Sequence, residues 1–326
     1  MWKALLWLLG LIVAAYLATV LGPWAYALVI RQALDEGAEL QEQQLSEFAP
    51  RVREVRDEQY DPTDSDAFLD VFHPLGVENP ALPTIVWVHG GGWISGDKDF
   101  AASYLKFWAS HGFTAVGVNF SLAPARKYPE PVRQVNRALA YLKENSERLQ
   151  VDPSKFFLAG ESSGAQIAAQ LANVISVPSY AKEMGIVPSI TRQQLRGIVL
   201  YSGIHDPDDL SVEDALGGYF RLMIKSYFGA KDYRNDPRFA QFSVVRHLTA
   251  EFPPMFISTS DVDPLARQSH KLAEVAASFG VPVYSVFYPK DHDPQVRIQY
   301  PFALNTDAGM LAFQDALIFA SNISKH

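Results

Sequence analysis

Apolar runs that alternate with helical stretches constrain the fold of this 326-residue chain more than any other feature of its sequence. The runs are rich in β-branched and aromatic residues, which favour strands. They lie at 84–89, 114–120, 156–159, 197–201, 255–259 and 283–288. Apolar residues recur three and four positions apart, as on a helix with one buried face, over 132–142, 165–174 and 265–279. This alternation predicts an α/β fold with a mostly parallel sheet and helices on both faces.

The first 32 residues differ in character from the rest of the chain. No charged residue stands between Ala4 and Ile30, and this length suffices for the helix of about 20 residues that crosses a bilayer. Segment 1–32 is therefore expected to be a single-pass transmembrane anchor, with Lys3 inside and the bulk of the chain extracytoplasmic. The alternatives are a buried core helix, or a signal peptide cleaved at Ala25-Tyr26-Ala27 that would leave a secreted or periplasmic protein.

Three further regions follow the anchor. Residues 33–60 place apolar positions among glutamate and glutamine, as in an amphipathic helix, and are expected to connect the anchor to the domain or to cover part of it. Residues 61–326 are expected to form one domain, in which 205–245 interrupts the alternation as a cap or lid insertion would. The aromatic residues of this insertion could line a substrate pocket or form its own small core: Tyr219, Phe220, Tyr227, Phe228 and Tyr233.

Composition excludes several classes of function. The chain has 28 Lys+Arg against 36 Asp+Glu and a formal charge of −8, and the absence of a basic run argues against nucleic-acid binding. The absence of cysteine excludes disulfides, thiolate metal sites and a cysteine nucleophile. No second histidine stands at ligand spacing from His292, so neither a metal nor a cofactor is expected. No pattern predicts an oligomeric state.

A candidate nucleophile lies in Gly160-Glu161-Ser162-Ser163-Gly164, directly after one apolar run and before a helical stretch. A G-x-S-x-G motif in this context places its serine on a sharp strand-to-helix turn, and the two glycines avoid clashes in that turn. The sequence therefore predicts Ser162 as the nucleophile. The backbone N–H of Ser163, at the start of the helix, is expected to stabilise developing negative charge, while its hydroxyl is structural.

A glycine-rich segment, His89-Gly90-Gly91-Gly92-Trp93, follows an earlier apolar run. Acyl transfer places negative charge on a carbonyl oxygen, and backbone donors fixed in advance stabilise that charge. Glycines let the backbone approach the substrate and adopt positive φ, so Gly91 and Gly92 are the expected oxyanion donors. His89 is expected to organise the loop rather than to transfer a proton. No Gly-Lys-Ser/Thr follows, which excludes a phosphate-binding loop.

These two motifs, with Leu122-Ala-Pro124, Phe252-Pro-Pro254 and Asp263-Pro264-Leu265, resemble the hormone-sensitive-lipase-like branch of α/β-hydrolase esterases. The resemblance covers roughly residues 60–320. It implies an α/β-hydrolase fold and a catalytic triad in the order serine, aspartate, histidine. Asp263 matches the acid of the family, and His292, which follows the last apolar run, stands where the family has its base.

The chemistry of the triad agrees with this assignment, since a serine nucleophile needs a neutral imidazole that a carboxylate holds in one tautomer. His205, at the end of a strand run, is a competing candidate for the base in place of His292, and Asp261 for the orienting acid. The family more often has aspartate and alanine beside the serine, where this chain has Glu161 and Ser163. Both replacements keep the chemical type, one a carboxylate and the other a small side chain.

The sequence thus predicts a serine carboxylic-ester hydrolase that acts on a small-molecule ester through an acyl-enzyme. An amidase or formamidase would use the same triad, because nothing in these residues separates amide from ester cleavage. A non-catalytic, receptor-like hydrolase domain is a third hypothesis, since a fold alone does not establish activity.

Overall fold

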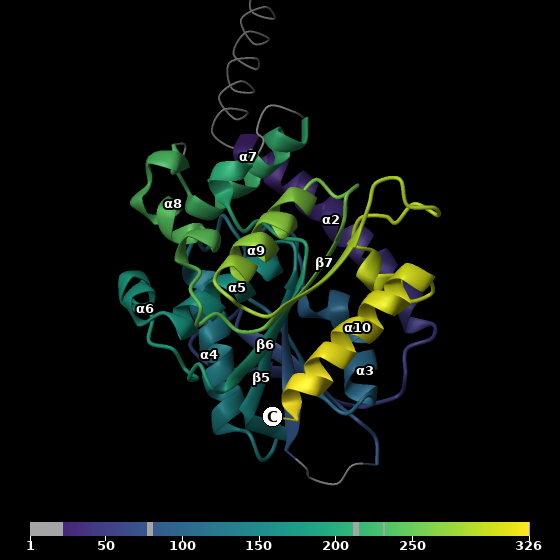
Figure 1. The fold of residues 1–326 in the computed structure, drawn as a ribbon. Helices are drawn as coiled ribbons and strands as arrows, with labels where there is room; N and C mark the ends of the chain where they lie inside the picture. The colour runs from purple at the N-terminus through teal and green to yellow at the C-terminus, as the bar shows by residue number, and fades with distance from the viewer. Residues whose placement is uncertain (1–21, 77–80, 211–214, 231, 326) are drawn as a thin grey trace, which may run out of the picture.

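The computed structural model describes residues 22–76, 81–210, 215–230 and 232–325, and Figure 1 shows their arrangement. Within these ranges, no helix combines the length and the apolar character needed to span a membrane. Most of the predicted span, up to Leu21, lies outside the described residues.

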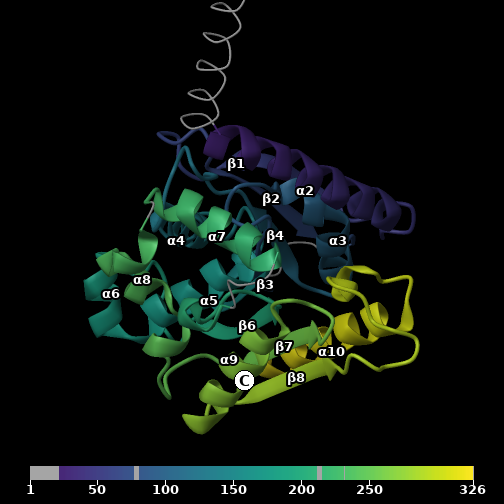
Figure 2. The same ribbon diagram turned by 90° about the horizontal axis from the view of Figure 1, so that it is seen from above.

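The described chain forms a sheet of eight strands in the order β1-β2-β4-β3-β5-β6-β7-β8. Figure 2 shows the sheet from above, with β1 at one edge and β8 at the other. The six strands from β3 to β8 are all parallel, and β1 and β2 add antiparallel pairs at one edge. The prediction of an α/β fold with a mostly parallel sheet is therefore confirmed. The strands span β1 (Arg53–Gln59), β2 (Phe68–His73), β3 (Leu82–Val88), β4 (Thr114–Val118), β5 (Val151–Glu161), β6 (Leu195–Tyr201), β7 (Met255–Ser260) and β8 (Val283–Tyr288).

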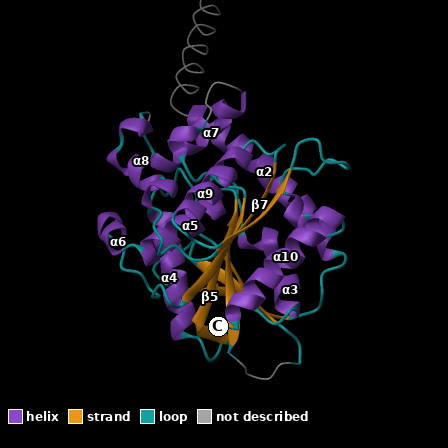
Figure 3. Ribbon diagram, in the orientation of Figure 1, coloured by secondary structure: helices purple, strands orange, loops and turns teal. Residues whose placement is uncertain are grey.

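Helices cover both faces of the sheet, because successive side chains of a strand point to opposite sides. In β3, Trp87 packs in a core with the helices α3 and α10, whereas Val86 and Val88 pack in a second core with α4, α5 and α9. Figure 3 shows the two layers on either side of the strands. The helices are α2 (Gly22–Ser46), α3 (Ala102–Ser110), α4 (Glu130–Glu144), α5 (Ser163–Ser176), α6 (Pro178–Met184), α7 (Ala215–Phe228), α8 (Pro237–Phe242), α9 (Ala266–Ser278) and α10 (Asp307–Ser324).

The helix expected over 33–60 ends earlier than that range. Helix α2 stops at Ser46, and residues 53–59 form the edge strand β1 instead. This strand reads Arg-Glu-Val-Arg-Asp-Glu-Gln, and its charges are typical of an edge that avoids pairing with other chains. A strand this polar lacks the apolar alternation by which strands are recognised, and for this reason the sequence predicts a helix here and not the strand that forms.

The described residues of 205–245 form the helices α7 and α8 and short 3-10 turns, and the aromatic side chains of this segment pack in the main core or line a pocket rather than form a core of their own. Tyr227, Phe228 and Tyr233 are buried, and Tyr227 stacks on Trp93 with ring centroids 4.8 Å apart. These three therefore belong to a core beneath the helices. Tyr219 and Phe220 instead line the pocket that contains Ser162.

Candidate active site

Ser162 lies on a sharp turn between β5, which ends at Glu161, and α5, which begins at Ser163. Its backbone has φ 53° and ψ −118°, an unfavourable conformation for a residue with a side chain. The neighbouring glycines make the turn possible. A Cβ atom on Gly160 would lie 2.6 Å from the carbonyl oxygen of Val88, and one on Gly164 would lie 2.0 Å from the same oxygen. The structure thus gives Ser162 the strand-to-helix position that the sequence motif predicts.

The glycine-rich loop after β3 lies beside this turn. Gly91 and Gly92 have φ of 100° and 63°, and both line the same pocket of about 200 Å³ as Ser162. A Cβ atom on Gly91 would lie 2.2 Å from the carbonyl oxygen of Ser95, so this position requires glycine. Ser163 is the first residue of α5, and its buried hydroxyl oxygen has no hydrogen-bond partner in the described part of the chain. This leaves its backbone N–H as the group of Ser163 that could serve the site.

His89 supports the loop from inside the protein. Its ring is buried, stacks on Phe120 with centroids 4.3 Å apart, and places Nδ1 2.9 Å from the carbonyl oxygen of Gly90. Burial lowers the pKa of His89, so the ring remains neutral at physiological pH. This placement is that of the loop-organising residue expected from the sequence.

Glu161 connects the serine turn to the glycine-rich loop, a role that the sequence motif does not reveal. Its Oε1 accepts a hydrogen bond of 2.6 Å from the N–H of Gly90, and its Oε2 accepts one of 2.6 Å from Trp87 Nε1. Burial raises the pKa of Glu161 to about 8, although both hydrogen bonds favour the ionised form. Through these two hydrogen bonds, the side chain of Glu161 fixes the distance between the serine turn and the glycine-rich loop.

Asp263 is buried at the end of β7 and lines the same pocket as Ser162. Its Oδ2 accepts a hydrogen bond of 2.6 Å from the hydroxyl of Ser202, and its Oδ1 accepts one of 2.8 Å from the N–H of Leu265. Burial raises the pKa of this carboxyl above its ordinary value. The alternative acid, Asp261, is exposed and lies 2.8 Å from Nε2 of His270. The geometry therefore favours Asp263 as the acid of the site.

His292 is not brought together with Ser162 and Asp263. Its Nδ1 lies 2.8 Å from the carbonyl oxygen of Pro294, and its ring meets that of Tyr288 edge-on with centroids 4.8 Å apart. It lines a larger, neighbouring groove rather than the pocket of Ser162. No hydrogen bond within the described ranges joins His292 to either residue.

The competing base, His205, has a structural role. It is fully buried, its Nε2 donates to the carbonyl oxygen of Ser202 at 3.0 Å, and burial lowers its pKa to about 4. It does not line the pocket of Ser162. A ring with this pKa and this fixed hydrogen bond is poorly suited to take a proton from a serine near neutral pH.

Helix α2 holds the far side of the glycine-rich loop. Asp35 Oδ1 accepts hydrogen bonds from the hydroxyl of Ser95 at 2.6 Å and from the N–H of Gly96 at 3.0 Å. One turn earlier, the guanidinium of Arg31 donates to the carbonyl oxygens of Ile94 and Ala123. The amphipathic pattern predicts that this helix covers something. It does not predict that the contact is with the loop of the candidate active site.

Replacing Asp35 with alanine is expected to lower kcat for ester hydrolysis roughly tenfold with little change in KM. Without Asp35 the glycine-rich loop is held less firmly, and the backbone donors predicted for Gly91 and Gly92 then stabilise the transition state less well. Asp35→Asn keeps an acceptor oxygen and should retain most of the rate. Glu42 is a matched control on the same helix, since it accepts from the N–H and hydroxyl of Ser103, away from the site. If steady-state kinetics show the same loss for Glu42→Ala, Asp35 only helps to dock the helix.

Turns of this kind, with a serine between a parallel strand and a helix at the carboxyl edge of the sheet, define the α/β-hydrolase class of proteins. A family model described as alpha/beta hydrolase fold matches residues 85–293, which is more than half of the chain. The chain therefore belongs to this family.

Solved structures of esterases share the fold. Esterase B of Lactobacillus rhamnosis superposes with a TM-score of 0.78 at 18% identity, over 92% of this chain and 97% of that one. An esterase of Pyrobaculum calidifontis has a TM-score of 0.72 at 18% identity, over 91% and 93%. A bacterial heroin esterase has a TM-score of 0.70 at 21% identity, over 90% of each chain. The α/β-hydrolase family that the motifs indicate is thus confirmed, and at these identities the likeness to solved esterases concerns the fold alone.

Proposed function

We propose that the protein is a serine carboxylic-ester hydrolase whose nucleophile is Ser162. The observation that carries the proposal is the backbone of Ser162, held at φ 53° on the strand-to-helix turn in a pocket shared with Gly91, Gly92 and Asp263. Strain of this kind persists where the surrounding structure enforces it, and it gathers at functional sites. The solved structures that share the fold and carry the name esterase support the same reaction class.

In the proposed mechanism, the Ser162 hydroxyl attacks the ester carbonyl carbon and transfers its proton to His292. The tetrahedral oxyanion accepts hydrogen bonds from the amides of Gly91, Gly92 and Ser163. Collapse of this intermediate releases the alcohol, to which His292 returns the proton. Water then attacks the acyl-enzyme and gives its proton to His292. Collapse of this second intermediate releases the carboxylic acid, and the proton returns to Ser162. Asp263 orients the imidazole and stabilises its protonated form.

This mechanism requires a rearrangement of the segment that follows β8. His292 has to exchange the carbonyl of Pro294 for the carboxylate of Asp263, which can keep the hydroxyl of Ser202 because each carboxylate oxygen accepts more than one hydrogen bond. Catalytic hydrogen bonds commonly tighten only when the reacting complex forms. We expect the move of His292 toward Asp263 to accompany binding of substrate in the pocket of Ser162.

The rate of ester cleavage tests the proposal. The chain is expected to hydrolyse p-nitrophenyl acetate, and Ser162→Ala is expected to lower kcat by several orders of magnitude. An aryl anilide with the same acyl group serves as the amide counterpart. Faster cleavage of the anilide would indicate an amidase, and binding of the ester without turnover would indicate a receptor-like domain.

An N-terminal membrane anchor completes the proposal, with the catalytic domain on the extracytoplasmic side. It rests on the absence of charge between Ala4 and Ile30. The full chain should then stay with the membrane during an alkaline carbonate wash, and deletion of residues 1–21 should release it. The deletion stops before Gly22 in order to keep Arg31, which contacts the glycine-rich loop. If the wash instead releases a protein that has been cleaved at Ala25-Tyr26-Ala27, the N-terminal segment is a signal peptide.

A further inference from the structure

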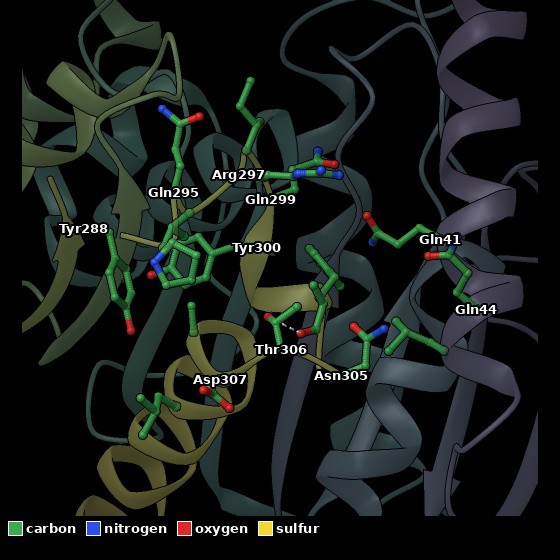
Figure 4. Close-up of a pocket in the computed structure, with 18 of the residues that line it drawn as sticks. Gln41, Gln44, Tyr288, Gln295, Arg297, Gln299, Tyr300, Asn305, Thr306 and Asp307 are labelled. Atoms are coloured by element: carbon green, nitrogen blue, oxygen red, sulfur yellow. Dashed lines mark hydrogen bonds between the residues drawn. The ribbon is translucent and has the colours of Figure 1, made fainter. Parts of the chain in front are cut away.

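Figure 4 shows a groove between α2 and the segment 288–311, which has a volume of about 660 Å³. Leu40 and Leu45 of α2, together with Phe48 in the turn after it, form one wall, and Phe302 and Leu311 belong to the opposite wall. The polar residues labelled in the figure include Gln41 and Gln44 of α2, one arginine and one aspartate. The lining therefore carries no strong charge of either sign, and it suits an uncharged ligand.

The apolar residues of this groove are unusually exposed for their type. Nine large apolar side chains of the described residues are strongly exposed, and four of the nine line this one groove. They are Leu40 at 60%, Phe48 at 43%, Ile298 at 52% and Leu311 at 50% exposure. Single exposed apolar residues are ordinary on a protein surface, whereas a cluster of them marks a binding surface.

The groove adjoins the pocket of Ser162. Ile298, Gln299, Tyr300 and Phe302 line both of them. The pocket at Ser162 measures about 200 Å³, which is smaller than the roughly 300–1,000 Å³ typical of ligand sites, and the groove lies within that range. The groove therefore offers, beside the serine pocket, the room that a longer apolar group of a substrate needs.

We propose that this groove binds the long alkyl chain of the ester, so that the substrates are amphiphilic esters rather than small polar ones. The inference rests on the proposed function, since it takes Ser162 as the reacting group. The lining residues that the groove shares with the serine pocket favour the substrate's own chain over a second protein as the occupant. The walls from α2 and α10 do not belong to the segment that carries His292, so they remain when that segment rearranges.

The wild-type chain is therefore expected to cleave p-nitrophenyl decanoate with a higher kcat/KM than p-nitrophenyl acetate, by up to about fourfold for each methylene fully buried. Decyl acetate, followed by release of acetate, tests whether the alkyl chain in the groove comes from the alcohol instead. Long-chain preference in either arm supports the inference. A preference for the two-carbon acyl group combined with slow cleavage of decyl acetate would overturn it.

Leu40→Gln removes an apolar contact in the groove and should lower kcat/KM for the preferred long ester about fivefold or more, while the rate on p-nitrophenyl acetate stays within about twofold. Leu75→Gln is the matched control, since Leu75 is 59% exposed and lies outside the groove. It should change neither rate. Equal losses on long and short esters in Leu40→Gln, or no loss on either, would contradict a chain-binding role.

Failure of the proposed function can be told apart from failure of this inference. If the wild-type chain cleaves no ester, the proposed function is wrong. The groove is then tested without turnover, by binding of an uncharged fluorescent long-chain alcohol to the Ser162→Ala chain with and without Leu40→Gln. Weaker binding in the double variant supports the groove as a site for alkyl chains, and unchanged binding overturns it.

Discussion

Replacing His292 with alanine is expected to lower kcat for ester hydrolysis by about three orders of magnitude or more, because without a base the hydroxyl of Ser162 is a weak nucleophile. In the structure, His292 lies outside the pocket that contains Ser162 and Asp263. A large loss would mean that the segment after β8 brings the imidazole to the serine during the reaction.

The controls use the neighbouring pair, Asp261 and His270. These two side chains contact each other at the surface, so His270→Ala and Asp261→Asn should keep kcat within about twofold of wild type. Asp263→Asn should lower kcat strongly, because the imidazole then loses its orienting carboxylate. Full activity of His292→Ala, measured with p-nitrophenyl acetate, would show that another group acts as the base.

Gly164→Ala is expected to destabilise the fold by more than about 3 kcal/mol, or to prevent folding, because the added methyl group has no space. Its Cβ would lie 2.0 Å from the carbonyl oxygen of Val88 and 2.4 Å from that of His89. Both are backbone atoms where β3 passes into the glycine-rich loop, so relief would require the two halves of the site to separate.

Gly37→Ala is the matched control for this glycine replacement. Gly37 lies in α2, and a Cβ there would meet nothing within 4 Å. The replacement should therefore stabilise the protein by about 0.5–1 kcal/mol, as alanine does within helices. Urea unfolding measures both variants. A free energy of unfolding for Gly164→Ala within about 1 kcal/mol of wild type would mean that the turn is looser than the structure indicates.

The inner parallel strands could be predicted because their side chains face a core on both sides, and β8 at the edge because its run is rich in β-branched and aromatic residues. The run at 283–288 coincides with β8, and the run at 156–159 lies within the longer β5. The antiparallel strands β1 and β2 are not continuous apolar runs, so this pattern does not predict them. The edge strand β1 is charged, and Asp70 interrupts β2, where the ion pairs with Lys98 and Arg56 permit its burial.

The local parts of the candidate site could also be predicted, since the turn at Ser162 and the glycines at 91 and 92 depend on short-range sterics. They meet Asp263 because the carboxyl ends of parallel strands lie at one edge of a sheet. The position of His292 depends on how the segment after β8 packs, and no local pattern encodes that packing. The hydrogen bonds of Arg31 and Asp35 were missed for a similar reason, because an amphipathic helix does not reveal which surface it contacts.

The most direct test of the central claim is covalent labelling of the nucleophile by a fluorophosphonate, read by mass spectrometry of the intact chain and of its peptides. The wild-type chain should gain one adduct, located on Ser162, and Ser162→Ala should gain none. Ser163→Ala should still be labelled, because the hydroxyl of its serine is buried and its backbone N–H is retained. Equal labelling of wild type and Ser162→Ala, or an adduct on another residue, would contradict the assignment of Ser162.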